Sequence, residues 1–307
     1  PSATADERGV LEAVDAVELA LGRLGHRSSR IAVDAPGGRW LHSLHGARAD
    51  LVFNLCEGAG GSSANEARIA AAVELLDIPM TGSTAETLAF ARRKDRVNAV
   101  LGAAGLPVPA WARIVDGLAP RGWTHFPAIV KPAAEDASLG ITQASIARDA
   151  RELGTAIEAA APFAPLLVQQ FLDGREINVG VLGDEVLPLS EIDFGTVPAS
   201  HWRIVSYRAK WESGSDEDRA TAPQCPALLD EHTAERARCL ALDAWRLIEG
   251  RGYGRVDLRT DDTGTPHVLE VNPNPDLAPA AGFARMATAA GYDYVELIDR
   301  ILTEALK

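Results

Sequence analysis

The chain of 307 residues is acidic, with a net charge of −13, and 47% of its residues are hydrophobic. This length and hydrophobic content allow two or three lobes with substantial cores, and the negative charge disfavours a nucleic-acid partner. No apolar run approaches the roughly 20 residues of a membrane span, and no signal peptide is recognisable. We therefore expect a cytoplasmic protein without membrane contact. Cys56, Cys225 and Cys239 are odd in number and lack Cys-x-x-Cys spacing, which argues against a disulfide framework and a zinc site.

The first part of the chain alternates helical and extended patterns. Apolar residues recur at helical spacing over residues 6–24, and Gly25 suits a helix C-cap. Residues 29–34 and 50–55 are short extended runs, and residues 65–76 are helical again. This alternation predicts a small parallel sheet.

A glycine-rich loop, Leu55-Cys-Glu-Gly-Ala-Gly-Gly61, follows the second extended run. Backbone at such a loop can approach a ligand closely. Glu57 in the loop and Glu66 just after it are candidates to hold a substrate ammonium group. A loop acid that simply faces water is an equally good interpretation.

A lysine ends the apolar run Phe126-Pro-Ala-Ile-Val-Lys-Pro132, and a loop of small residues follows at 133–140. A charged group at the end of a buried strand needs a partner, and such a loop can cover phosphates with its backbone N–H groups. Residues 84–104 read as one helix with Arg92, Arg93 and Lys94 at its middle. Three adjacent basic residues usually form a solvated helix face.

The remaining elements alternate between both patterns before a final hairpin. We expect helices at 148–160, 231–249, 283–290 and 294–306, and strands at 166–172, 174–182 and 186–193. Residues 212–222 are acidic without apolar periodicity, which predicts a mobile loop or lid. Leu240, Trp245 and Ile248 should pack on the hairpin.

The stretch from residue 253 to residue 275 predicts that hairpin, because alternating runs flank Asp261-Asp-Thr-Gly264, which is typical of a turn. Arg255 and Asp257 share one face, and so do Glu270 and Asn272. If the faces coincide, Asp257, Glu270 and Asn272 supply three hard oxygen ligands, a set that suits Mg²⁺. The alternative is that these polar residues only face water, but an acid inside Val-Leu-Glu-Val favours a metal.

The motifs Gly254-Arg-Val-Asp257 and Leu269-Glu-Val-Asn-Pro273 resemble the metal-binding end of ATP-grasp ligases, most closely the D-alanine–D-alanine ligase branch. The resemblance covers nearly the whole chain. It implies an α/β chain of the α+β ATP-grasp type, with an N-terminal α/β lobe at 1–86 and two lobes at 87–174 and 175–307 that clamp ATP. Such ligases begin one strand earlier, so we expect the first strand to be missing. A homodimer is also implied.

The resemblance further implies an ATP site. The family loop Lys-Pro-x-x-Glu-Gly-Ser-Ser-x-Gly is matched at Lys131, Glu135, Ser138 and Gly140, whereas Asp136 and Ala137 depart from it. Lys94 aligns with a phosphate-contacting lysine, and Lys210, in Tyr207-Arg-Ala-Lys-Trp211, would point at the terminal phosphate. The hinge that hydrogen-bonds adenine through its backbone would comprise Gln169, Gln170, Phe171 and Leu172, with Gln169 replacing a usual glutamate. Glu176 would meet the ribose hydroxyls.

The implied activity is an ATP-dependent carboxylate–amine ligase that works through an acyl phosphate on amino acids or small peptides. Two Mg²⁺ ions, or Mn²⁺ in their place, would bridge the phosphates, and Arg255 would stabilise the oxyanion. Two alternatives remain open. One is a true D-alanine–D-alanine ligase, and the other is a non-catalytic ATP-binding regulatory module.

The substrate loops depart from the family pattern. Glu57-Gly58 and Ala64-Asn-Glu66 stand where the ligases have His-Gly and Gly-Glu-Asp-Gly, and Asp276 and Ala281 replace a glycine-containing segment and a serine near the acceptor carboxylate. We therefore expect D-alanine to be a poor acceptor. Asp276 would attract a cationic acceptor, or Arg285 would reach a longer one's carboxylate. An arginine on a helix surface without a role is an equally good interpretation.

Overall fold

The computed structural model describes residues 5–33, 38–135, 138–212 and 214–307. The N-terminal elements are α1 (Ala5–Arg23), α2 (Arg39–Ala47), α3 (Asn65–Glu74), α4 (Ala85–Ala91) and α5 (Lys94–Ala103). The middle elements are β1 (Trp111–Arg113), β2 (Ala128–Pro132), η1 (Gln143–Ser145), β3 (Ile146–Ala147), α6 (Ala150–Ala160), η2 (Ala161–Phe163) and β4 (Leu166–Gln170). The C-terminal elements are β5 (Glu176–Leu182), β6 (Glu185–Val186), β7 (Ser190–Asp193), α7 (Tyr207–Trp211), α8 (Asp216–Arg219), β8 (Ala222–Gln224), α9 (Glu231–Leu247), β9 (Tyr253–Thr260), β10 (Pro266–Asn272), α10 (Gly282–Ala289) and α11 (Tyr294–Ala305).

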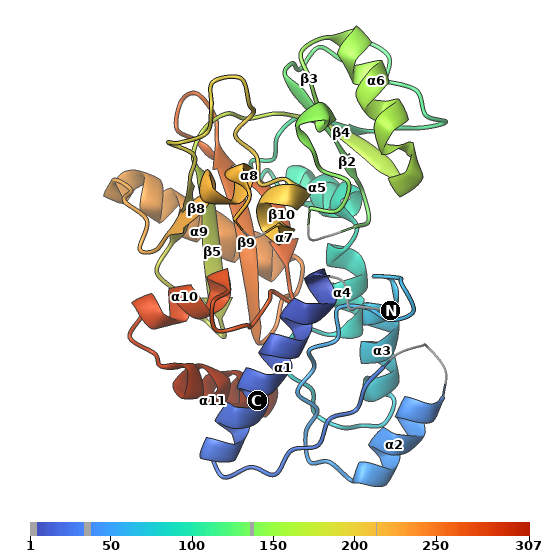
Figure 1. Cartoon of the computed structure of the whole chain (residues 1–307), viewed down its shortest axis with the longest axis vertical. Coiled ribbons are helices and arrows are strands. Elements are labelled where there is room, and N and C mark those ends of the chain that lie inside the picture. Colours follow the sequence, from blue (N-terminus) through green and yellow to red (C-terminus); the bar gives the residue numbers. More distant parts are fainter. Residues whose placement is uncertain (1–4, 34–37, 136–137, 213) are drawn as a thin grey trace.

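Two antiparallel sheets, each backed by a helix, dominate the chain after α5 (Figure 1). The first has the order β1-β4-β2-β3 and packs on α6. The second has the order β10-β9-β5-β7-β8, with β6 paired to β5, and packs on α9. In both sheets the alternate side chains pack against the helix, so the other face is free to carry polar groups. This mixture of helices and antiparallel sheets confirms the α+β part of the fold prediction.

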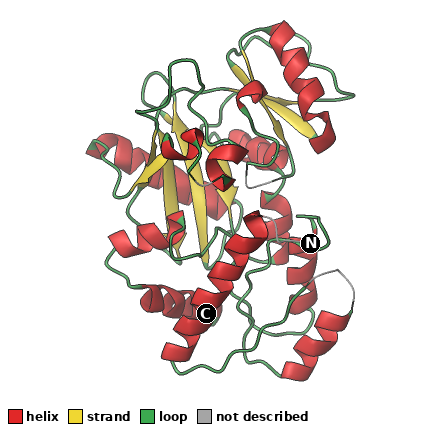
Figure 2. Cartoon of the chain, in the orientation of Figure 1, coloured by secondary structure: helices red, strands yellow, loops and turns green. Residues whose placement is uncertain are grey.

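The N-terminal part contains helices and loops, and Figure 2 draws no strand in its described residues. The predicted parallel sheet at 29–34 and 50–55 is therefore wrong there, although Asp34 itself lies outside the described residues. Among the described residues of these two runs, only Val52 makes a parallel bridge, to Met80, with a 2.8 Å bond from its N–H to the Pro79 carbonyl. Ile31 and Val33, both partly buried, pack in the same cluster as Trp40 instead. Apolar side chains can pack without a ladder, whereas a sheet needs a neighbouring strand for each backbone group.

The helix predicted over 84–104 is broken at Arg92 and Arg93 into α4 and α5. Contacts with the loop after β2 explain the break. The Lys94 N–H donates to the Ala133 carbonyl at 2.9 Å, and Arg92 Nη1 donates to the Ala134 carbonyl at 2.7 Å. The lobe boundary expected after residue 86 consequently falls inside α4, which packs against α3. The other long helices lie close to their predicted positions.

The segment 212–222, predicted to be a mobile loop or lid, contains the short helix α8, which Ser215 caps by accepting from the Asp218 N–H. Ser213 lies outside the described residues. The final hairpin is confirmed as β9 and β10, and Leu240, Trp245 and Ile248 pack in the same core as Val256 and Val271. No helix in the described ranges is long and apolar enough to cross a membrane.

Candidate active site

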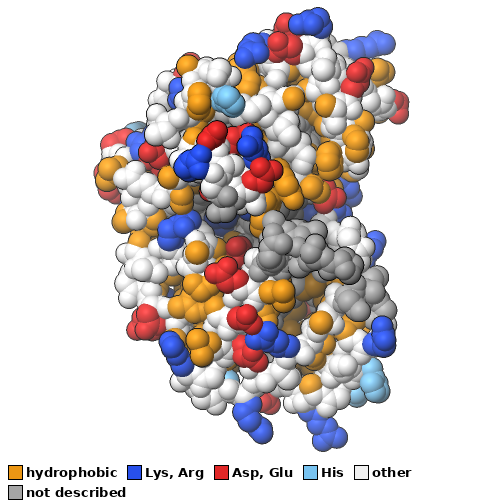
Figure 3. All heavy atoms as spheres, in the orientation of Figure 1, with side chains coloured by type: hydrophobic (Ala, Val, Ile, Leu, Met, Phe, Trp, Pro, Cys, Tyr) orange, Lys and Arg blue, Asp and Glu red, His pale blue; other side chains and the backbone are white. Residues whose placement is uncertain are grey.

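Every predicted site residue except Lys94 lines one cleft, between the N-terminal part and the polar faces of the two sheets. Lys94 reaches the same cleft from behind through its contact with Glu270. Figure 3 shows charged side chains of both signs scattered over this face of the molecule, without a large patch of one sign. The selectivity of the cleft therefore depends on individual contacts.

The hairpin register brings the predicted metal ligands together. Asp257 lies opposite Glu270 and Arg255 lies opposite Asn272, with a register shift between Val268 and Glu270. Asp257 accepts from Arg255 Nε at 2.7 Å and Arg255 Nη2 at 2.8 Å, and from Asn178 Nδ2 on β5 at 2.8 Å. The interpretation that these polar residues only face water is thus excluded for Asp257, because its carboxylate is held by two side chains.

Lysines surround the other carboxylate. Lys94, only 7% exposed, places its Nζ 3.3 Å from Glu270 Oε1 and 2.6 Å from the Glu135 carbonyl. Lys94 is therefore not part of a solvated helix face. Burial, reinforced by the nearby charge of Lys94, lowers the pKa of Lys131 to about 8. A group of partly desolvated cations of this kind is stabilised by an anionic ligand.

The donor set fits a magnesium ion. Within the described ranges no group of three or more His, Cys, Asp or Glu side chains is placed to hold a metal. The candidate set is two carboxylates and the Asn272 amide, whose Oδ1 accepts from the Asn274 N–H at 2.9 Å. Hard oxygen donors that leave positions for water and phosphate are what Mg²⁺ prefers. Arg255 and Lys94 balance the charge of these carboxylates.

The small-residue loop after β2 is anchored at both of its described ends. Glu135 Oε2 accepts from Ser63 Oγ at 2.9 Å, which joins this loop to the N-terminal glycine-rich loop. Ser138, in the left-handed region with φ 60°, donates to the Val205 carbonyl at 3.0 Å. Asp136 and Ala137, which depart from the family loop, lie outside the described residues. The loop therefore runs between the glycine-rich loop and the segment that leads to Lys210 and α7.

The expected adenine hinge has fewer free amides than its sequence suggests. The Gln170 N–H donates to the Ala110 carbonyl at 2.7 Å, and the Phe171 N–H donates to the Pro127 carbonyl at 2.8 Å. The amides of Gln170 and Phe171 are thus already bonded within the protein and are not available to a base. Glu176, expected near ribose, accepts from Arg259 Nη1 at 3.0 Å. Burial raises the pKa of Glu176, and the charge of Arg259 opposes that rise.

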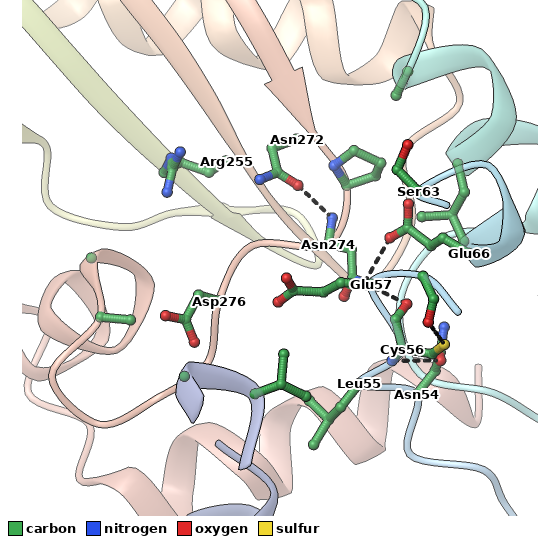
Figure 4. Close-up of a pocket in the computed structure, with 18 of the residues that line it drawn as sticks. Asn54, Leu55, Cys56, Glu57, Ser63, Glu66, Arg255, Asn272, Asn274 and Asp276 are labelled. Atoms are coloured by element: carbon green, nitrogen blue, oxygen red, sulfur yellow. Dashed lines mark hydrogen bonds between the residues drawn. The ribbon is translucent and has the colours of Figure 1, made fainter. Parts of the chain in front are cut away.

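The expected substrate residues meet at the lower end of the cleft, shown in Figure 4. Glu66 Oε1 accepts from Asn274 Nδ2 at 2.8 Å, and Tyr253 donates its hydroxyl to Asn274 Oδ1 at 3.1 Å. The Glu57 carboxylate points across the pocket toward Asp276, as Figure 4 shows. Asp276 also accepts from the Ala278 N–H at 2.8 Å. The carboxylates of Glu57 and Asp276 thus both line this pocket.

Arg285 lines this pocket but turns its Nη1 to the Ala280 carbonyl, at 2.7 Å. The structure therefore gives it a local role in holding the start of α10.

Three comparisons with known proteins agree with one another. Residues 100–303 match the model of the D-Ala–D-Ala ligase C-terminus family. The chain is 36% identical to a D-alanine–D-alanine ligase of Alcanivorax borkumensis, over 84% of this chain and 78% of that one. It is 32% identical to a D-alanine–D-alanine ligase of Gluconobacter oxydans, over 99% of this chain and 96% of that one. The crystal structure of D-alanine–D-alanine ligase from Bacillus anthracis complexed with ATP has the same fold, with a TM-score of 0.80, 20% identity, and coverage of 99% and 94% of the two chains.

The chain belongs to the D-alanine–D-alanine ligase family. It is accordingly an ATP-dependent ligase that forms carbon–nitrogen bonds, and ligases of this family use ATP and Mg²⁺.

Four residues that support this ligase site were not predicted from the sequence: Ser63, Asn178, Arg259 and Asn274. Asn178 could have been predicted from the sequence, because polar and apolar residues alternate in Glu176-Ile-Asn178 as they do in the hairpin strands. The contacts of Ser63 and Asn274 join segments more than 70 residues apart, and no local pattern identifies them.

Proposed function

We propose that this ligase joins a carboxylate to an amine through an acyl phosphate, with substrates other than two D-alanine molecules. A substrate carboxylate oxygen attacks the terminal phosphorus of ATP and ADP leaves. The amine nitrogen then attacks the acyl carbon, phosphate leaves, and the nitrogen gives up a proton. The observation that carries this proposal is the convergence of Lys94, Lys131, Arg255, Asp257 and Glu270 in one cleft.

The cations would bind the triphosphate. Lys94 is buried beside Glu270, and Lys131 and Lys210 line the cleft. Asp257, Glu270 and Asn272 would hold magnesium, two ions in our proposal and replaceable by Mn²⁺. Bound there, magnesium would neutralise charge that develops on the phosphate oxygens.

Arg255 would stabilise the oxyanion formed when the amine attacks. Its guanidinium is paired with Asp257, and Figure 4 shows it at the edge of the pocket, on the face that also carries Asn272. A metal bound to Asp257 would compete with this ion pair and release the guanidinium toward the substrate. A module that only binds ATP has little use for such an arginine, which favours catalysis over the regulatory alternative.

The acceptor pocket favours a cationic amine over D-alanine. The Glu57 carboxylate points toward Asp276, both acids line the pocket, and each would repel the carboxylate of a small amino acid. Ala281 is the N-cap of α10 and makes no side-chain capping bond, so a serine hydroxyl that could bind a carboxylate is missing there. We therefore propose amino acids with basic side chains, or amines without a carboxylate, as acceptors.

Phosphate release with matched acceptors tests the proposal. The panel compares D-alanine, larger neutral amino acids, basic amino acids and amines that lack a carboxylate, each with several carboxylate donors. Release with basic acceptors and little with D-alanine supports it. Efficient formation of D-alanyl-D-alanine would instead identify a true D-alanine–D-alanine ligase. Measurable ATP binding without release for any pair would favour the regulatory module.

A further inference from the structure

Asn274, two residues after the candidate metal ligand Asn272, is held by three other segments of the chain. Its Nδ2 donates to Glu66 Oε1 on α3 at 2.8 Å and to the Cys56 carbonyl of the glycine-rich loop at 3.4 Å. Its Oδ1 accepts from the hydroxyl of Tyr253 on β9 at 3.1 Å. Figure 4 shows Asn274 between Asn272 and Glu66, with dashed lines to both. The side chain of Asn274 therefore joins the end of the hairpin to the N-terminal segments that line the substrate pocket.

The partners of this amide fix its orientation. A backbone carbonyl and an ionised carboxylate accept hydrogen bonds but cannot donate them, so the nitrogen must be the atom that faces Cys56 and Glu66. The oxygen then faces Tyr253, whose hydroxyl keeps its proton because burial raises the pKa of this residue. Both ends of the Asn274 amide are thus bonded within the protein. Such an amide suits a residue that positions its neighbours.

The backbone of Asn274 is constrained as well. Pro273 and Pro275, both buried, lie on either side of it and restrict the dihedral angles of this turn. The Asn274 N–H donates to Asn272 Oδ1 at 2.9 Å. One short turn thus connects a candidate metal ligand with the Glu66 carboxylate in the substrate pocket.

We propose that Asn274 is a positioning residue, which holds the Glu66 carboxylate in place to bind a positively charged group of a substrate. This inference rests on the proposed ligase function and extends it to a residue that does not itself touch the substrate. Without a fixed partner, the long side chain of Glu66 would lose rotamer freedom each time a substrate binds. The bond from Asn274 removes that entropic cost from the binding step.

Steady-state kinetics with a double-mutant cycle test this role. The assay uses the most active substrate pair from the phosphate-release panel and measures KM for each substrate in turn. Glu66→Gln should raise one KM about 10- to 100-fold, the size of one hydrogen bond to a charged group. Asn274→Leu should raise the same KM about tenfold and change kcat less. The double variant should be no worse than Glu66→Gln alone, because Asn274 acts only through Glu66.

The dependence on Mg²⁺ and the affinity for ATP separate positioning from general damage to the site. Asn274→Leu keeps the bond to Asn272, which the backbone N–H makes, so both quantities should equal those of the wild type. The Tm should fall by about 4 °C, because the buried Tyr253 hydroxyl loses its acceptor.

Tyr292→Phe is the matched control for that loss of stability. The Tyr292 hydroxyl donates to the Glu185 carboxylate at 2.9 Å, and neither residue lines the described part of the cleft. This variant should lower the Tm by a similar amount and keep the KM values of the wild type.

Asn274→Leu combined with Tyr253→Phe separates stability from positioning. It replaces both partners of the buried bond by apolar groups, so the Tm should recover while KM stays raised. This variant also carries the test if Asn274→Leu alone does not fold. A recovered KM here, an unchanged KM in Asn274→Leu, or effects of Asn274→Leu and Glu66→Gln that multiply would each overturn the inference.

The same measurements distinguish this inference from the proposed function. If D-alanine proves to be the best acceptor and Asn274→Leu raises a KM with it, the proposed acceptors are wrong and the inference stands. Normal turnover with the proposed acceptors and an unchanged KM in Asn274→Leu would leave the proposed function standing without the inference. No phosphate release by the wild type with any pair would overturn both.

Discussion

Replacement of Glu270 by glutamine tests the metal site most directly. The substitution keeps the shape of the side chain and removes its charge, which leaves Lys94 without the carboxylate that lies 3.3 Å from its Nζ. The direct attraction at that distance is about 5 kcal/mol at an effective dielectric constant of about 20, much of it offset by desolvation. With side chains 7% and 25% exposed, the pair lies between a surface pair and a fully buried one.

The expected loss of stability is therefore about 2 kcal/mol, above the ~1 kcal/mol of a surface pair and below the ~3–5 kcal/mol of a broken buried pair. For a chain of this size that corresponds to a fall in Tm of about 4 °C. The effect on activity should be larger. Loss of a partner behind a metal ligand already costs about 10- to 100-fold, so loss of a ligand should cost at least about 100-fold in turnover.

The assay measures phosphate release against Mg²⁺ concentration, together with Tm in the absence of metal. Glu191→Gln is the matched control, because Glu191 is 12% exposed and pairs with Arg175 on the same sheet, through a 2.6 Å bond from Nε. It should lose similar stability and keep the Mg²⁺ dependence of the wild type. Near-normal turnover of Glu270→Gln at the same Mg²⁺ concentration would refute the assignment of Glu270 as a metal ligand.

Three further predictions concern other parts of the cleft. Arg255→Ala should lower kcat far more than it lowers ATP affinity. It should also tighten Mg²⁺ binding in the absence of nucleotide, because Asp257 loses its bidentate partner. A loss of stability with an unchanged rate in the folded fraction would show that the ion pair is purely structural. Since the pKa of Lys131 is lowered to about 8, its charge is lost as the pH rises through that value. ATP affinity should therefore fall between about pH 7 and pH 9, and ATP binding near pH 8 should be accompanied by proton uptake. Calorimetry in buffers of different ionisation enthalpy measures this uptake, and finding none would show that Lys131 stays charged. Ala281→Ser should cap α10, raising stability by about 1 kcal/mol, and improve D-alanine as an acceptor; an unchanged KM for D-alanine would place the acceptor elsewhere.

The hairpin is the part of the site whose side-chain arrangement could be predicted from the sequence. Alternation along residues 255–259 and 267–272 fixes which side chains share a face, because the side-chain period of a strand is two residues. That was enough to predict that Asp257 and Glu270 converge, which the register confirms. The helices predicted by apolar spacing are likewise found in place, since their periodicity is a local property of the chain.

The wrong predictions of secondary structure lie where contacts with distant segments override the local sequence pattern. Residues 29–33 and 50–55 read as strands, but their apolar side chains pack, partly buried, without a sheet in the described part of the chain. The helix predicted over 84–104 breaks where Arg92 and Lys94 meet the carbonyls of the loop after β2. In both places the deciding partner lies in a distant segment, so neither outcome can be read from the local sequence.

The sequence by itself thus determined most of the helices after α5, the faces of the hairpin and the family to which the chain belongs. The tertiary structure alone decided the pairs that complete the site. Lys94 meets Glu270 across 176 positions of the chain and Asn274 meets Glu66 across 208. It also decided that Gln169 has a buried amide without a partner. The physical reason is that periodicity encodes which face of an element is buried, whereas the packing of the whole chain sets what lies opposite that face.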